Sequence, residues 1–373
     1  MTMLHPAQPI LPTASPDASQ VTIIVSPRER FSYTRESLES IYAHTSLPFH
    51  LIYLDGGSPA PVRQYLETQA AQRGFQLIRT DYYLAPNQAR NLGLSHVTTP
   101  YVLFIDNDVE VTPGWCDRLL ECAEDTGATV VCPLTCIGKP LHQKIHLAGG
   151  EARLVLEIQG NQSRYKVHEK HYFVNRPIAE VADQLQRRQC EFAEFHCMLV
   201  RTDIFQTTGL LDEKLRSTRE HIDFCLNVTR AGGTIFCEPA SVVTYVPEVL
   251  YRWSDLSYFM LRWSDEWEEK SLKHFRKKWN LDKDKYFKKR YRRMGHRRHQ
   301  AFLRPLIRRL TFGKPIPWVE QGAIALERRF NRWFTATYQR RTAHLPRLAP
   351  ALPPLAATSE VTAASQPKSH ATR

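Results

Sequence analysis

Short apolar runs alternate with segments of helical periodicity between residue 21 and about residue 135. A short apolar run bounded by turn-forming residues is typical of a buried strand, and apolar positions three or four apart indicate one face of a helix. Because strands and helices alternate, the pattern predicts an α/β fold with a mixed, mainly parallel sheet flanked by helices. The predicted strands cover residues 21–25, 49–54, 75–78, 101–105 and 128–132, and the predicted helices cover residues 33–44, 61–74, 87–95 and 115–124.

The alternation weakens after about residue 135. Residues 137–188 show no clear period, and we expect a hairpin and a substrate-facing loop there. Ordered segments are then predicted at 192–200 and 202–208, followed by a helix at 215–230 that ends at two glycines. Residues 234–237 form the last predicted strand.

Composition divides the chain into four parts. Residues 1–20 are rich in Pro, Ala and Ser and predict a disordered leader, and residues 345–373 predict a disordered tail. Residues 21–250 contain the α/β domain. Residues 251–344 are rich in Trp, Tyr, Phe, Lys and Arg at helical spacing, which predicts a basic helical extension.

The net charge of +12 is concentrated in that extension, because residues 285–309 contain eleven Lys and Arg and no acid. Eight cysteines are scattered without a CxxC pair, so we expect reduced, mostly buried thiols and no zinc site. No signal sequence or membrane-spanning run is recognised, which favours a cytoplasmic protein, peripheral at most at the inner face of a membrane.

The apolar run at residues 101–105 stops on Asp106-Asn107-Asp108. A buried strand that ends on two acids places them at the carboxyl edge of the sheet, where open α/β folds bind ligands. Two carboxylates at this spacing can hold Mg²⁺ or Mn²⁺, and such an ion can neutralise a diphosphate. The other interpretation is an ordinary Asp- and Asn-rich turn.

Five motifs occur in a fixed order along residues 21–245: SPRER at 26–30, LDGGS at 54–58, NQARNLG at 87–93, DND at 106–108 and REHIDFCL at 219–226. Together they resemble the nucleotide-diphospho-sugar transferases of glycosyltransferase family 2. The resemblance implies a GT-A fold. It also implies metal-dependent, inverting transfer of a sugar from a UDP- or GDP-sugar type donor to a hydroxyl of a saccharide, lipid-linked or envelope glycan acceptor.

The resemblance also assigns the donor and metal sites. Asp106 and Asp108 would form the metal site, with Asp108 as the direct ligand and Asp106 near the ribose or acting through water. Asp106 and Asn107 would also lie beside the donor. Asp55 would accept a hydrogen bond from the base, although it is also placed to begin an Asx turn. Arg90 would support the diphosphate, and it could at the same time pair with an Asp of the sheet edge. Pro27 and Glu29 complete the predicted donor contacts.

The catalytic base is expected in the segment that contains Glu220, His221 and Asp223, in that order of preference. The other interpretation of the two acids is favourable placement at a helix N-terminus. This chain departs from the family pattern because His221 occupies the second acidic position, and Arg28 stands where an aromatic residue is usual. Residues 243–247 contain no later His, so the third metal ligand stays open between donor oxygens and His221.

Two further regions keep alternatives open. Glu194 and His196 could contact an acceptor sugar or be purely structural. The aromatic extension at 251–344 could pack on the domain or bind an anionic membrane surface, and nucleic-acid binding is not expected because no such motif is present. The departures at His221 and residues 243–247 leave a second function open, a catalytically degenerate domain that binds a nucleotide-sugar or a membrane surface.

Overall fold

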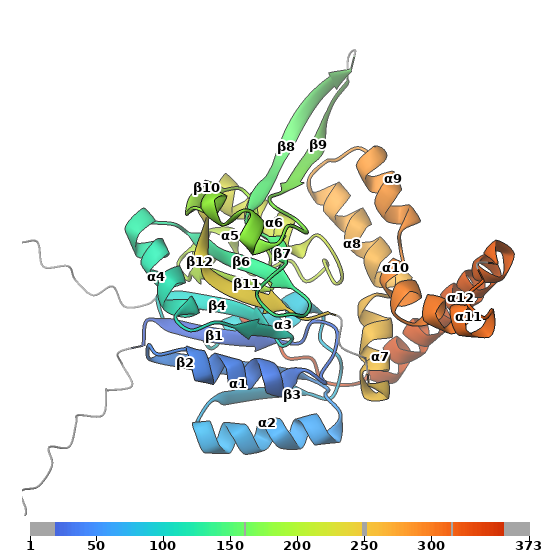
Figure 1. The fold of residues 1–373 in the computed structure, drawn as a ribbon, viewed down its shortest axis with the longest axis horizontal. Helices are drawn as coiled ribbons and strands as arrows, with labels where there is room; N and C mark the ends of the chain where they lie inside the picture. Colours follow the sequence, from blue (N-terminus) through green and yellow to red (C-terminus); the bar gives the residue numbers. More distant parts are fainter. Residues whose placement is uncertain (1–18, 160–161, 248–251, 315, 354–373) are drawn as a thin grey trace, which may run out of the picture.

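The computed structural model describes residues 19–159, 162–247, 252–314 and 316–353, and Figure 1 shows the fold. Residues 1–18 of the predicted leader and residues 354–373 of the predicted tail lie outside the described residues. Residues 345–353 contain no helix or strand.

A ten-stranded sheet forms the centre of the molecule, in the order β10-β12-β6-β11-β4-β1-β2-β3, with β5 paired to β12 and β7 paired to β6. The pairs β1–β2, β1–β4, β2–β3 and β6–β12 are parallel. β11 runs antiparallel between β4 and β6. The strands of this sheet are β1 (Val21–Ser26), β2 (Phe49–Gly56), β3 (Gln76–Thr80), β4 (Tyr101–Asp106), β5 (Val109–Val111), β6 (Val130–Ile137), β7 (Ile145–Leu147), β10 (Arg188–Cys190), β11 (Cys197–Arg201) and β12 (Ile235–Tyr245).

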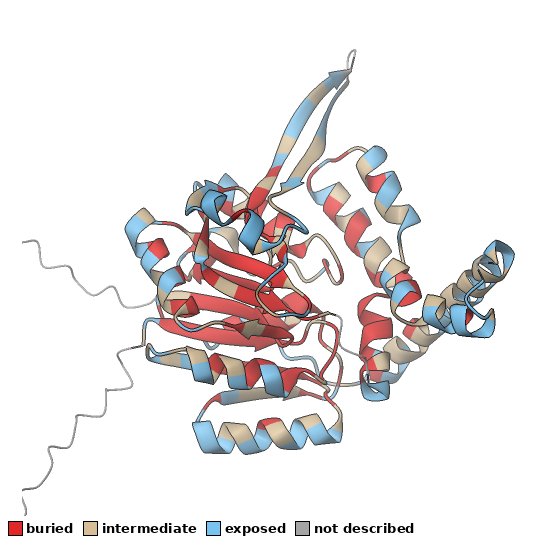
Figure 2. Ribbon diagram, viewed as in Figure 1, coloured by how far each residue is buried: buried red, intermediate tan, exposed pale blue. Residues whose placement is uncertain are grey.

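Helices cover both faces of the sheet, and the alternation of side chains along β1 shows how the two cores are divided. Ile23 packs with Leu38 in the core under α1, α2 and α4, whereas Ile24 packs with Ala89 in the core under α3, α5 and α6. Figure 2 shows the central strands buried throughout. The helices are α1 (Thr34–His44), α2 (Ala60–Arg73), α3 (Pro86–Leu94), α4 (Trp115–Thr126), α5 (Ile204–Thr208) and α6 (Glu220–Arg230).

The expected α/β fold with a mixed, mainly parallel sheet is therefore confirmed, and several boundaries are corrected. The last strand is much longer than residues 234–237, because it resumes after a register shift between Glu238 and Val242 that accommodates Pro239. The helix predicted at 215–230 begins only at Glu220, because Arg219 adopts a left-handed φ of 73°. β5 was not predicted, since three residues carry too little periodicity.

The weakly patterned region contains the expected hairpin, β8 (Gly150–Gln159) and β9 (Gln162–His171), which projects away from the sheet in Figure 1. It is followed by two short 3-10 turns, η2 (Ile178–Glu180) and η3 (Ala182–Gln184). All eight cysteines are free and buried, as the sequence predicted.

The extension is helical and docks on the α/β domain. Its helices are α7 (Trp253–Arg262), α8 (Asp265–Lys278), α9 (Lys285–Arg292), α10 (His296–Arg298), α11 (Arg304–Leu310) and α12 (Pro317–Thr342), with the π-helical turn η4 (His299–Leu303) between α10 and α11. Phe275 of α8 and Phe287 of α9 join Ile222 of α6 in one buried cluster. The packing interpretation of the aromatic segment is therefore right for α7, α8 and α9, and also for the part of α12 in which Tyr338 Oη accepts a hydrogen bond from Tyr83 N. In Figure 1, α11 and the start of α12 project outward.

Candidate active site between the sheet edge and the helical extension

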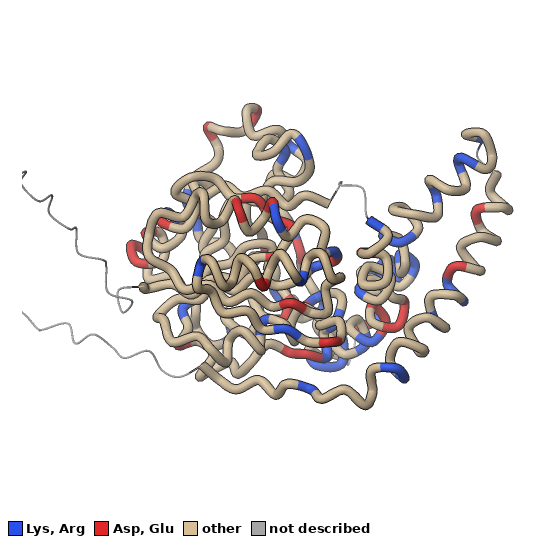
Figure 3. The backbone as a smooth tube through the Cα atoms, turned by 90° about the horizontal axis from the view of Figure 1, so that it is seen from below, with Lys and Arg blue, Asp and Glu red and all other residues tan. Residues whose placement is uncertain are grey.

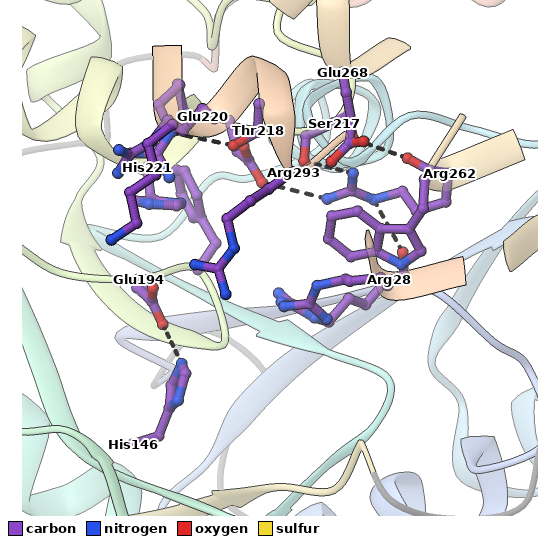
Figure 4. A pocket seen from close by; sticks show the side chains of 16 residues that line it. Arg28, His146, Glu194, Ser217, Thr218, Glu220, His221, Arg262, Glu268 and Arg293 are labelled. Atoms are coloured by element: carbon purple, nitrogen blue, oxygen red, sulfur yellow. Dashed lines mark hydrogen bonds and ion pairs between the residues drawn. The ribbon is translucent and has the colours of Figure 1, made fainter. Parts of the chain in front are cut away.

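A cavity of about 380 Å³ lies where the carboxyl edge of the sheet faces the extension. Figure 4 shows its lining side chains converging from both sides. The α/β domain contributes Arg28, His146, Glu194 and the segment 217–221, and the extension contributes residues from α7 to α10. The site therefore cannot form from the α/β domain alone.

Asp106 ends β4 and is completely buried. Its carboxylate accepts hydrogen bonds from Arg28 Nη1 at 3.1 Å and from Arg90 Nη2 at 3.0 Å. His196 Nδ1 lies 3.3 Å from Asp106 Oδ2. Burial would raise the pKa of Asp106, but His196, Arg28 and Arg90 outweigh it and hold the pKa well below its usual range. The carboxylate of Asp106 is thus ionised, and most of its hydrogen-bond acceptor positions are already occupied by protein side chains.

Asp108 has the opposite environment. It is also completely buried, yet neither of its carboxylate oxygens accepts a hydrogen bond from any described residue. The nearest cation is Arg30, whose Nε lies 3.8 Å from Asp108 Oδ2. Burial raises the pKa of Asp108 to about 7. A buried carboxylate that accepts no hydrogen bond is costly, and the distant Arg30 offsets this cost only in part, so Asp108 fits a divalent metal.

Asn107, Glu29 and Pro27 are occupied inside the protein. Asn107 accepts from Arg28 N and donates to Arg30 O, which fixes the loop after β1. Glu29 accepts hydrogen bonds from Tyr245 Oη at 2.8 Å and from Trp263 Nε1 at 2.9 Å. The carbonyl of Pro27 accepts from Tyr258 Oη of α7. Their role as donor contacts stays a prediction; in this structure they hold the loop and dock the extension.

Asp55 forms the Asx turn that the sequence left open as its second role. It accepts from Ser58 N and Ser58 Oγ, both at 2.9 Å, and it pairs with Arg79 of β3. A donor base would therefore meet an Asp55–Arg79 pair rather than an isolated carboxylate. Arg90 likewise makes the expected ion pair with Asp106 and stacks over the Phe195 ring, 4.1 Å from its centroid.

Glu220 is the first residue of α6 and faces the cavity. Its Oε1 lies 3.4 Å from Arg262 Nη2, and its Oε2 is buried without a hydrogen-bond partner among the described residues. Burial would raise the pKa of Glu220, but His221, Arg262 and Arg90 outweigh it, and the pKa lies below its ordinary value. Glu220 is thus ionised at neutral pH and has one free oxygen.

The neighbours of Glu220 have different roles. His221 lines the same cavity, and burial lowers its pKa, so its imidazole is neutral near pH 7. Asp223 does not line the cavity; it accepts hydrogen bonds from Lys278 Nζ at 2.7 Å and Trp279 Nε1 at 2.8 Å. Glu220 therefore faces the cavity with one free oxygen, whereas Asp223 ties α6 to Lys278 and Trp279 at the end of α8. The left-handed backbone at Arg219 is a local strain of about 1–3 kcal/mol of the kind found at functional sites.

The sequence did not single out the cations that the extension brings to the cavity. Arg290 pairs with Glu169 and Arg297 pairs with Glu29. Lys289 and Arg293 also line the cavity, and their side chains form no hydrogen bond or ion pair with a described residue. The charge run at 285–309 was the available signal, but it does not say which side chains turn inward. The cavity thus offers unpaired positive charge opposite an ionised carboxylate.

Comparisons with known proteins show the family of the chain. The model of the family described as glycosyl transferase family 2 matches residues 22–209. The pre-mycofactocin glycosyltransferase of Mycobacterium tuberculosis (strain CDC 1551 / Oshkosh) is 24% identical over 244 residues, which is 65% of this chain and 45% of that protein. The succinoglycan biosynthesis protein ExoW of Rhizobium meliloti (strain 1021) is 24% identical over 218 residues, which is 56% of this chain and 63% of that protein.

The chain spans about half the length of the first of these curated relatives. Among solved structures, GalNAc-T7 with UDP, GalNAc and Mn²⁺ is similar with a TM-score of 0.46 and 16% identity, over 76% of this chain and 58% of that one.

Proposed function

Because this chain belongs to glycosyl transferase family 2, we propose that it moves a sugar from a UDP- or GDP-sugar to an acceptor hydroxyl, with Mg²⁺ or Mn²⁺ and with inversion. The observation that carries the proposal is Glu220, an ionised carboxylate with one free oxygen in a cavity that also presents unpaired cations. Inverting transfer needs one base for the attacking hydroxyl, and the leaving diphosphate needs positive charge.

Each charged group then has a task. Glu220 Oε2 accepts the proton of the acceptor hydroxyl. At the same time the hydroxyl oxygen forms a bond to the sugar carbon, and the bond from that carbon to the diphosphate breaks. Lys289 and Arg293 are free to bind phosphate oxygens. Arg28 and Arg90 hold Asp106 at the sheet edge and add positive charge there.

Asp108 would hold the metal together with donor oxygens, since its own oxygens are unpartnered. A divalent ion bound there supplies positive charge to the diphosphate. Asp106 would contribute less directly, because two arginines and His196 already surround it.

The donor can be identified by thermal stabilisation. Ligands that bind only the native state raise its melting temperature, by an amount set by their concentration relative to Kd. We expect one class of nucleotide-sugar to stabilise the protein with Mn²⁺ and to lose most of that effect with EDTA. Equal stabilisation with and without EDTA would show that the donor binds without a metal. The absence of stabilisation by any nucleoside diphosphate or nucleotide-sugar would argue against donor binding.

We also propose that the acceptor is lipid-linked or lies at an anionic membrane, because the projecting part of the extension exposes aromatic and basic residues together. Phe312 is 93% exposed and Trp318 is 76% exposed at the turn between α11 and α12. Arg308, Arg309 and Lys314 lie beside them in the chain, and Figure 3 shows basic residues along both helices. In the part of the chain that the structure describes, no helix is long and apolar enough to span a bilayer.

Replacing both Phe312 and Trp318 with Ser should weaken binding to anionic vesicles by about 10-fold or more, because burying one large apolar side chain contributes about 1.5–3 kcal/mol. Sedimentation with phosphatidylglycerol vesicles measures the effect. Ile158→Ser is the matched control, since Ile158 is 74% exposed on the distant β8 hairpin. Equal binding by the double variant and the wild-type chain would contradict the assignment of this tip.

A further inference from the structure

We propose that His146, Glu194 and His196 bind a divalent transition-metal ion at a site separate from Asp108. One ligand atom from each residue lies within 4.8 Å of the other two. The distance from His146 Nε2 to Glu194 Oε2 is 2.9 Å, and that from His196 Nε2 to Glu194 Oε2 is 3.6 Å. These separations are close to those between neighbouring ligands of one ion, whose bonds to nitrogen and oxygen are about 2.0–2.2 Å.

Sheet register brings these residues together, although they are far apart in the chain. His146 is the central residue of β7, which pairs with β6. His196 directly precedes β11, and its carbonyl accepts a hydrogen bond from Asp106 N at 3.1 Å. Because β7 and β11 belong to the same sheet, the two imidazoles are held on rigid backbone.

His196 lies between two carboxylates, and this environment favours a bound cation. Its Nδ1 lies 3.3 Å from Asp106 Oδ2 and its Nε2 lies 3.6 Å from Glu194 Oε2. A neutral imidazole has a single N–H, so it can donate to only one of these carboxylates. If the proton is on Nδ1 and faces Asp106, the lone pair of His196 Nε2 faces Glu194 Oε2. The lone pair and the carboxylate oxygen then repel each other, and a metal ion bound between them would remove this repulsion. A carboxylate behind a ligating histidine is the usual outer partner at metal centres.

The site opens to the proposed active-site cavity. His146 and Glu194 line that cavity, with side chains 24% and 13% exposed, whereas His196 is buried behind them. A bound ion would therefore keep at least one position for water or a substrate oxygen. Two imidazoles and one carboxylate suit Mn²⁺, Co²⁺ or Zn²⁺ better than Mg²⁺, which prefers oxygen ligands. Any catalytic use of this ion rests on the proposed function; its binding does not.

Equilibrium dialysis of the full chain against Co²⁺ or Mn²⁺, without nucleotide, tests the site. We expect about one ion per chain, and at least about a 10-fold loss of affinity in His146→Ala and in Glu194→Gln. Asp108→Asn should bind the ion as the wild type does, and excess Mg²⁺ should not displace it. His142→Ala is the matched control, because His142 is half-buried nearby and pairs with Thr244 instead.

Absence of ion binding by the wild-type chain would overturn the proposal. So would loss of binding in Asp108→Asn with retention in His146→Ala. His146 is partly exposed, so its variant is expected to fold, and circular dichroism melting checks this. An ion bound at this site in a chain that turns over no nucleotide-sugar would leave the site standing and refute the proposed function. Donor turnover by a chain that binds no ion at this site would support the proposed function and refute the ion site.

Discussion

Replacing Glu220 with Gln should lower the rate of sugar transfer by about 10²- to 10⁴-fold, the usual contribution of a positioned general base. The amide keeps the shape of the side chain but cannot take the proton of the acceptor hydroxyl. Arg262 retains its hydrogen bonds to Ser217 O at 2.6 Å and Arg28 O at 3.2 Å, so the cavity wall should persist. Steady-state assays and a melting curve of the variant measure both effects.

Asp223→Asn is the matched control, since Asp223 lies in the first turn of the same helix but binds Lys278 and Trp279. We expect it to lower the melting temperature while leaving turnover per folded molecule within a few-fold. Greater loss of turnover in Asp223→Asn than in Glu220→Gln would reverse the assignment of the base.

Replacing Asp108 with Asn should remove most metal-dependent donor binding and reduce turnover by at least about 100-fold, because a neutral amide cannot balance the ion that the diphosphate needs. Folding should survive and even improve slightly, since the variant relieves a buried carboxylate with no hydrogen-bond partner. Donor titration followed by calorimetry, with and without Mn²⁺, measures the loss. Wild-type Mn²⁺-dependent affinity for the donor in this variant would refute the metal assignment of Asp108.

The pH dependence of donor binding should reflect the protonation of Asp108. The pKa of Asp108 is raised to about 7 by burial, and a proton competes with the metal for the carboxylate. Metal-dependent donor affinity should therefore fall as pH decreases through about 7 and plateau above it. For folding without metal the sign is opposite: since the folded-state pKa exceeds the unfolded one, this group's contribution to stability falls as pH rises from about 4 to 7.

Local sequence was sufficient for the sheet-edge part of the site. Asp106 and Asp108 follow an apolar run whose length and composition predict a central strand, and Arg90 lies in a helix that must pack near the same edge. Motif order added the segment of Glu220, although it could not separate Glu220 from Asp223. That separation depends on Lys278 and Trp279, which reach Asp223 only because α8 docks on α6.

Long-range packing explains what the sequence could not provide. The cluster of His146, Glu194 and His196 depends on how β7 and β11 join the sheet. β7 has only three residues and was not predicted, and no local pattern shows that it meets the ordered segment predicted at 192–200. Lys289 and Arg293 belong to a run of basic residues in which spacing alone does not mark the two that face the cavity. The extension was predicted as a separate segment, whereas Glu29 and Trp263 make it one wall of the site.

Release of nucleoside diphosphate tests both the transfer reaction and the assignment of Glu220 as its base. The purified chain is supplied with Mn²⁺, a panel of UDP- and GDP-sugars and candidate acceptors, and release is followed for the wild type and for Glu220→Gln. We expect release from at least one donor by the wild-type chain, and at least about a 100-fold lower rate in the variant. Release from no donor, or release at equal rates by both proteins, would contradict it.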